Sequence, residues 1–330
     1  MNQWVYDRNT DLKVFGLSML FAICLGMAFP DFNFYGTMFV YVFIDISHSF
    51  STYFYTLSSD RINSSHHRYF FWGMLTLVFA ISNSMLYGGM GYWLVKLYAI
   101  ASVYHFMKQS QAWIFIVSKK SRPKTKFEDR LNFCTSYAAV WCPQVMSMAQ
   151  VKATPWFTEG DVPALPLYFR DLSLAVGVVV GIVYVALEIK RWREDRVILW
   201  AKHFHVAYGC LVWSAARLGS LNFLAASISP LMMMATHSFP YYYLGHRYIQ
   251  KRSSQQEKFW PYFKSHNLFI LFIWASCLIL TSWQFISVRY IYDKHYFISA
   301  IFISIAVTHY IFDSYLWKKE THPEGTEVFR

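Results

Sequence analysis

The sequence predicts an all-α membrane protein, a polytopic bundle of about ten transmembrane helices. Its composition is the first observation that predicts this fold class. Of 330 residues, 55% are hydrophobic and 20% are aromatic. Only 15% are charged, against roughly 25% in an ordinary soluble domain. This excludes a disordered chain, which needs low hydrophobicity. The five cysteines exclude a disulfide-stapled module, because they are odd in number and sparse.

The second observation is the length of the apolar stretches. A bilayer core of about 30 Å needs about 20 apolar residues of helix. Ten stretches reach this length: 12–29, 32–57, 69–88, 90–117, 131–151, 171–189, 197–217, 219–246, 267–288 and 295–317. The first lacks a signal-peptide cleavage pattern, so we expect it to be a retained spanning helix. We expect one integral-membrane domain over residues 1–330, with a mobile polar tail at 318–330.

The third observation is the distribution of basic residues, which gives the orientation. With the N-terminus in the cytoplasm, 22 of the 30 Lys and Arg residues fall in cytoplasmic segments and 5 in the opposite loops. Cytoplasmic loops carry such an excess, so both termini are predicted to be cytoplasmic. We expect an integral protein of the bacterial inner membrane. The net charge of +11 follows from this asymmetry, so no nucleic-acid partner is expected.

Ionisable side chains recur inside the predicted helices, where such groups are expensive and mark function. Asp45 and His48 are spaced i, i+3, and His309 and Asp313 are spaced i, i+4, so each pair shares one helix face. The other histidines in the spans are His105, His203, His205 and His237. At most one of His203 and His205 faces the common site, because positions two apart face different ways. The spacing to the next cytoplasmic charge puts His48, His105, His237 and His309 within about 8 Å of one another in depth.

Imidazole together with carboxylate is the ligand set of a non-haem iron, manganese or zinc site. The predicted metal ligands are Asp45, His48, His105, His203, His237, His309 and Asp313. This set suffices for two metals about 3.5–4 Å apart. We therefore predict iron as the cofactor, with two ions, and keep manganese and zinc open. The candidate catalytic residues are Tyr104, Gln109 and Tyr241, whose polar groups can orient ligand imidazoles. His66 or His67, in the adjoining loop, is a further possible ligand.

These Asp/His pairs near the cytoplasmic ends of several spans resemble the histidine-rich integral-membrane iron enzymes. That class includes lipid desaturases and hydroxylases and the bacterial membrane carotenoid-cleaving dioxygenases. The run Tyr104-His105-Phe106 is similar to a His-Phe run of the last group. The HxxxH and HxxHH boxes of desaturases are missing, and His66-His67 is the one adjacent pair. The resemblance implies O₂-dependent oxidation of a lipid or other apolar substrate at a metal centre reached from the bilayer.

Other interpretations remain open. Intramembrane Asp and His also occur in metal-ion or proton-coupled transporters, although no internal repeat is visible here. Two helices that each offer a His can ligate haem b, but haem needs no carboxylate. Lys108 or Lys202 could instead neutralise the buried carboxylates as ion pairs. No dinucleotide fingerprint is present, so any reducing equivalents would come from a separate electron donor.

Overall fold

The computed structural model describes residues 3–30, 44–45, 47–57, 65–121, 123–149, 164–220, 227–253, 275, 279 and 294–316. Within these residues the regular structure is helical and contains no strand, which confirms the all-α prediction. The predicted stretch 267–288 lies almost wholly outside the described residues, and the tail 318–330 lies wholly outside them.

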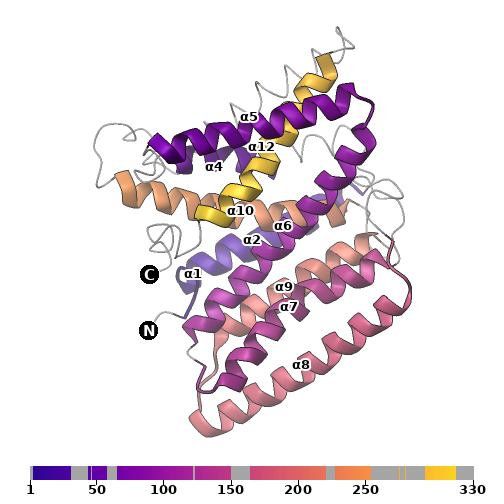
Figure 1. Ribbon diagram of the computed structural model, residues 1–330. Coiled ribbons are helices and arrows are strands. Elements are labelled where there is room, and N and C mark those ends of the chain that lie inside the picture. Colours follow the sequence, from indigo (N-terminus) through magenta and orange to yellow (C-terminus); the bar gives the residue numbers. More distant parts are fainter. Residues whose placement is uncertain are drawn as a thin grey trace. The chain divides into compact units, whose positions relative to one another are not determined.

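Most of the helices follow the apolar stretches of the sequence (Figure 1). Their bounds are α1 Arg8–Asp11, η1 Leu12–Gly16, α2 Leu17–Ala28, α4 Ser47–Leu57, α5 Ser65–Tyr87, α6 Gly91–Lys120, α7 Lys126–Met148, α8 Tyr168–Asp195, α9 Trp200–Ser220, α10 Ile228–Ser253 and α12 Lys294–Leu316. Three helical segments are long and apolar enough to cross a membrane: Arg8–Ala28, Tyr69–Tyr87 and Tyr168–Asp195. They support membrane association, whereas the ten-span bundle stays a prediction.

The described chain divides into two compact units. Unit 1 contains Met1–Thr37 and Val103–His237, and unit 2 contains Met38–Ser102 and Ser238–Arg330. The boundary falls inside α6 and inside α10, so each of these helices contributes residues to both units. The prediction of a single domain over 1–330 stays a prediction.

In unit 1, α7 packs against α8 and α9 (Figure 1). The beginning of α7 is set by a reciprocal cap. The Thr125 side chain accepts a hydrogen bond from the Glu128 N–H at 3.1 Å, and the Glu128 carboxylate accepts the Lys124 N–H. Such capping satisfies backbone donors that a helix start leaves without partners. The end of α8 is set by Arg196, which adopts the left-handed conformation with φ 56°.

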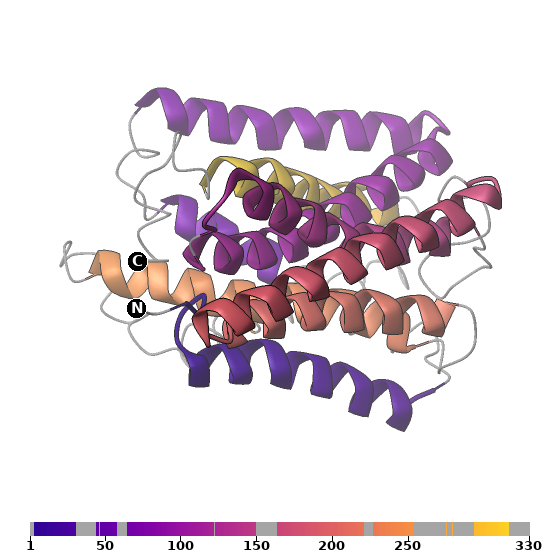
Figure 2. The same ribbon diagram turned by 90° about the horizontal axis from the view of Figure 1, so that it is seen from below.

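In unit 2, α12 packs against α4 and α5 (Figure 2). The core between them is aromatic and contains Tyr53, Phe71, Ile305 and Phe312. The Phe71 ring lies 5.3 Å from that of Tyr53 and 4.4 Å from that of Phe312, centroid to centroid. The Tyr53 hydroxyl also donates to the Ile305 carbonyl at 3.2 Å. This packing holds α4 against α12. It thereby fixes the positions of His48 on α4 and His309 on α12, which lie about one helical turn from the aromatic core.

Candidate metal centre

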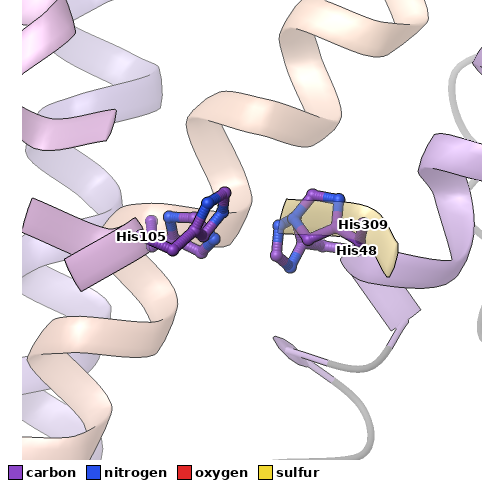
Figure 3. A group of neighbouring side chains, drawn as sticks. His48, His105 and His309 are labelled. Carbon is purple, nitrogen blue, oxygen red and sulfur yellow. The ribbon is translucent and has the colours of Figure 1, made fainter. Parts of the chain in front are cut away.

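Two histidines of unit 2 form the first part of the site. His48 comes from α4 and His309 from α12, and both side chains are fully buried. Their ring centroids are 4.4 Å apart and their planes are nearly perpendicular, at 89° (Figure 3). Imidazoles buried this deeply need defined partners for their ring nitrogens.

The tautomer of His48 is set by a residue that precedes its helix. Its Nδ1 lies 2.8 Å from the Asp45 carbonyl oxygen. Because a carbonyl only accepts, Nδ1 carries the proton and Nε2 carries the lone pair. The Asp45 carboxylate Oδ1 lies 3.6 Å from the same Nδ1. A histidine that donates one N–H to a carbonyl or carboxylate presents the other nitrogen as a metal ligand.

The tautomer of His309 is set by a chain of hydroxyl groups. The Tyr241 hydroxyl donates to Asp313 Oδ1 at 2.5 Å, so its oxygen must accept the Thr52 hydroxyl proton across 2.7 Å. Thr52 Oγ1 then accepts the proton of His309 Nδ1 across 2.6 Å. The direction of the whole chain follows from its carboxylate end, which accepts. His309, like His48, therefore presents Nε2 as its lone-pair nitrogen.

Two histidines of unit 1 form the second part. His105 on α6 and His237 on α10 are buried, with ring centroids 4.9 Å apart and planes at 79°. His105 is labelled in Figure 3. The Phe106 ring lies 4.4 Å from the His237 ring. Unit 1 thus repeats the arrangement of unit 2, two buried imidazoles in edge-to-face contact.

Helices α6 and α10 each contribute residues to both units. On α10, His237 of unit 1 precedes Tyr241 of unit 2 by four residues. On α6, His105 of unit 1 follows Ser102 of unit 2 by three residues. Within unit 2, Tyr241 belongs to the hydroxyl chain that ends at His309, and the Ser102 hydroxyl lies 2.8 Å from that of Tyr310.

The structure places the histidines of α9 elsewhere in unit 1. His203 Nδ1 lies 2.8 Å from the Tyr184 hydroxyl, and its Nε2 lies 3.7 Å from Glu188 Oε2. His205 Nε2 lies 2.9 Å from Asp11 Oδ2, and both side chains are fully buried. Within the described residues, neither joins the group of histidines placed to hold a metal.

Asp11 is a buried carboxylate that the sequence did not single out as a candidate site residue. Its carboxylate accepts the Val5 N–H at 2.8 Å and the Tyr6 N–H at 3.0 Å, besides contacting His205. The signal that points to it is a carboxylate at the beginning of an apolar stretch, which requires a buried partner.

The three candidate catalytic residues differ in their burial and in their contacts. Tyr241 is buried within the hydroxyl chain. Tyr104 is 52% exposed, with its ring 6.0 Å from Trp141. The buried amide of Gln109 makes no hydrogen bond to any described residue. The side chains of His66 and His67 lie outside the described residues.

The two lysines considered as ion-pair partners have other contacts. Lys202 Nζ lies 2.5 Å from Glu188 Oε1. Lys108 Nζ donates to Gln111 at 2.9 Å and to the Tyr137 hydroxyl at 3.2 Å. These contacts replace the ion pairs with Asp45 or Asp313 that the sequence left open.

No protein-family model, curated protein sequence or solved structure matches this chain. The class of protein is therefore argued from the fold and the site alone. The regular structure of the described residues is helical, and three of the helical segments described there are able to cross a membrane. Its four buried histidines, His48, His105, His237 and His309, can each offer one ring nitrogen to a metal ion. Imidazole nitrogen suits iron, zinc, copper and nickel, so the donors fit a metal without fixing which one.

Proposed function

We propose that this protein is a membrane-embedded, metal-dependent oxidoreductase that oxidises a lipid or another apolar substrate with O₂. Its metal is iron, with manganese and zinc as the alternatives, and its ligands are His48, His105, His237 and His309. The observation that carries the proposal is the burial of these four imidazoles, each able to offer one nitrogen. Bound iron would supply the redox chemistry toward O₂. The setting we propose is the ten-helix bundle of the inner membrane, with both termini cytoplasmic.

The positions of the carboxylates favour one metal ion over two. Asp45 Oδ1 and Asp313 Oδ1 each lie 3.6 Å from the Nδ1 of their partner histidine. That nitrogen carries the proton and would face away from a metal bound at Nε2. The carboxylates would then orient the rings and raise their basicity without binding the metal. A second ion would need further donor atoms, such as the oxygens of these carboxylates.

An apolar pocket in unit 2 supports an apolar substrate. Its volume is about 580 Å³, and its lining includes Phe50, Tyr53, Trp72 and Ile305. Binding pockets for small molecules typically have about 300–1,000 Å³ and mostly apolar walls. Ile305 precedes His309 by four residues on α12, so the pocket begins about one helical turn, or 6 Å, from this ligand. The pocket walls would bind the substrate and exclude water from the same unit that holds the His48–His309 pair.

The ring geometry argues against haem within either pair. Haem b stands between two imidazoles that approach its opposite faces. The rings of His48 and His309 are in edge-to-face contact at 4.4 Å, and those of His105 and His237 at 4.9 Å. Neither pair leaves room for a macrocycle between its rings. Transport remains the second candidate function, because buried Asp and His are also proton-relay residues.

Metal analysis of the detergent-purified chain tests the proposal. We expect one iron per chain and no Soret absorption. Alanine at His48, His105, His237 or His309 should each lower the bound iron by about tenfold or more, while the protein still inserts. His203→Ala is the matched control, because His203 is bonded to Tyr184 and Glu188, and it should keep its iron.

The remaining outcomes separate the alternatives. Two irons per chain in the wild type, with iron lost in His203→Ala, would instead support the two-ion site predicted from the sequence. A protein without metal after expression with iron, manganese and zinc would overturn the proposal and favour transport, measured as uptake by proteoliposomes. Removal of a bound metal by a chelator should also lower the unfolding temperature, since a ligand at 1,000 times its Kd stabilises by about 4 kcal/mol.

A further inference from the structure

A groove on unit 1 is lined by none of the four histidines of the candidate metal centre. It lies between α7, α8 and α9 and has a volume of about 520 Å³. Most of its lining is apolar, contributed by residues such as Ala139, Met146, Val178 and Leu218. Polar side chains lie toward its ends, Ser173 and Arg217 at one and Tyr184 at the other. The groove therefore has the shape and polarity to take an amphiphile with one charged end.

Two glycines of α8 contribute to the hollow of the groove. Gly177 and Gly181, four residues apart, both line it. A Cβ at Gly181 would meet no atom within 4 Å, and a Cβ at Gly177 would lie 3.5 Å from the Cβ of Cys142. The space thus depends in part on these glycines, and a Cβ on Gly181 would enter open space.

The helix that forms the outer wall faces away from the protein. Helix α8 is one of the three segments able to cross a membrane, and only 11% of its apolar window is buried. In a bilayer, such a surface is in contact with acyl chains. From Ser173 to Tyr184 the groove follows eleven residues of α8, or about 16 Å of helix. That length matches the acyl chains of one leaflet, which fill half of a hydrocarbon core of about 30 Å.

One end of the groove carries arginine side chains. Arg217 lines the groove, and Arg170 lies near enough to interact with it electrostatically. Arg170 also donates to Asp171 Oδ1 at 2.8 Å. Guanidinium groups bind phosphate oxygens in a bidentate manner.

We propose that this groove binds one acyl chain of an anionic phospholipid, with the lipid phosphate at Arg217. The site needs no metal and is independent of the oxidoreductase function proposed above. The bound lipid would fill the space between α7, α8 and α9 and so complete the packing of unit 1.

Thiol reactivity of the wild-type chain tests the proposal. Cys142 and Cys210 line the groove, whereas Cys24 and Cys134 are exposed and serve as internal controls. The chain is placed in nanodiscs of phosphatidylcholine alone, or with phosphatidylglycerol, and treated with a small membrane-permeant thiol reagent. With phosphatidylglycerol we expect Cys142 and Cys210 to react about fivefold more slowly, which corresponds to a lipid at about four times its Kd. Cys24 and Cys134 should react at unchanged rates.

Variants then separate the chain site from the head-group site. Gly181→Leu fills the groove and should make the Cys142 and Cys210 rates independent of the lipid. Gly73→Leu, on α5, is the matched control, because a Cβ there also meets no atom within 4 Å, and it should behave as the wild type. Arg217→Gln should abolish the difference between the two lipids, whereas Arg217→Lys should retain most of it.

Two results would overturn the proposal. The first is equal protection of Cys142 and Cys210 by both lipids in the wild-type chain, which would mean that Arg217 selects no anionic head group. The second is protection in Gly181→Leu that equals that in Gly73→Leu, which would place the lipid outside the groove. Neither result bears on the iron content, so the two proposals fail separately.

Discussion

Thr52 joins two residues of the proposed centre through a single hydroxyl group. Its Oγ1 lies 2.6 Å from His309 Nδ1 and 2.7 Å from the Tyr241 hydroxyl. A hydroxyl has one proton to donate, and this one goes to Tyr241, because Tyr241 itself donates to Asp313. The hydroxyl therefore accepts from His309, and this keeps the His309 Nε2 free of a proton.

Removal of this hydroxyl should weaken metal binding without removing a ligand. Thr52→Val keeps the shape of the side chain but leaves His309 Nδ1 without its acceptor in a fully buried position. Loss of such a supporting partner typically costs about 10–100-fold in metal affinity. Thr52→Ser keeps the hydroxyl and should bind nearly as the wild type. Competition with a coloured chelator measures the affinities, and equal affinities for the two variants would contradict the hydroxyl chain.

The sequence predicts which residues lie close together because they are three or four positions apart on one helix. It does not predict which residues meet through the packing of different helices. The spacing of His48 and Asp45 already places them on one face, because i, i+3 contacts follow from the helix itself. The choice between His203 and His205 depends on what packs against α9. In the structure, His203 is hydrogen-bonded to Tyr184 and His205 to Asp11, and neither partner belongs to α9.

At the scale of elements, two helices of unit 1 approach each other closely at Gly26. A Cβ there would lie 2.5 Å from the Ile228 Cγ1 and 3.2 Å from its Cα. The Ser227 hydroxyl also donates to the Gly26 carbonyl at 3.0 Å. Because the near atoms include backbone, α2 and the beginning of α10 would have to separate to admit a side chain.

Gly26→Ala should therefore destabilise the protein by about 1–3 kcal/mol, the usual range for overpacking. Gly16→Ala is the matched control, because it is also helical and its Cβ would meet nothing within 4 Å. There the gain in helix propensity should stabilise by about 0.5–1 kcal/mol. Unfolding temperatures in one detergent give the comparison. A Gly26 variant as stable as the Gly16 variant would show that the two helices do not approach so closely.

Apolar length predicted most helices, but it could not predict where they end. Hydropathy marks the end of the apolar residues, whereas a helix ends where its backbone finds a cap. Helix α10 continues to Ser253, seven residues beyond the predicted stretch 219–246. The end of α8 depends on one left-handed residue, Arg196, which no apolar pattern reveals.

At the scale of the whole molecule, the sequence shows no sign of the division into two units. The boundaries fall within α6 and α10, where composition and spacing continue unchanged. Domain boundaries are recognised in sequences by polar or flexible linkers, and a boundary inside a helix has none. The division follows from which faces of the helices pack together, and this is a tertiary property.

The excess of basic residues on one side predicts how the whole chain lies in the membrane. The proposed topology puts the beginning of α7 in the cytoplasm, the beginning of α8 on the opposite side and the end of α8 again in the cytoplasm. Three exposed positions report on these places: Lys126, Leu167 and Arg193. Each is replaced singly by cysteine in a chain whose five cysteines are changed to alanine.

A membrane-impermeant maleimide added to intact cells should then label Leu167→Cys alone. Lys126→Cys and Arg193→Cys should react only after the membrane is opened. Labelling of both Leu167→Cys and Arg193→Cys in intact cells would mean that α8 does not cross the bilayer, although its length and apolarity allow it. Labelling of Lys126→Cys but not of Leu167→Cys would invert the orientation. The proposed metal centre would then lie nearer the outer face, because the depth of its histidines was assigned from the same count of charges.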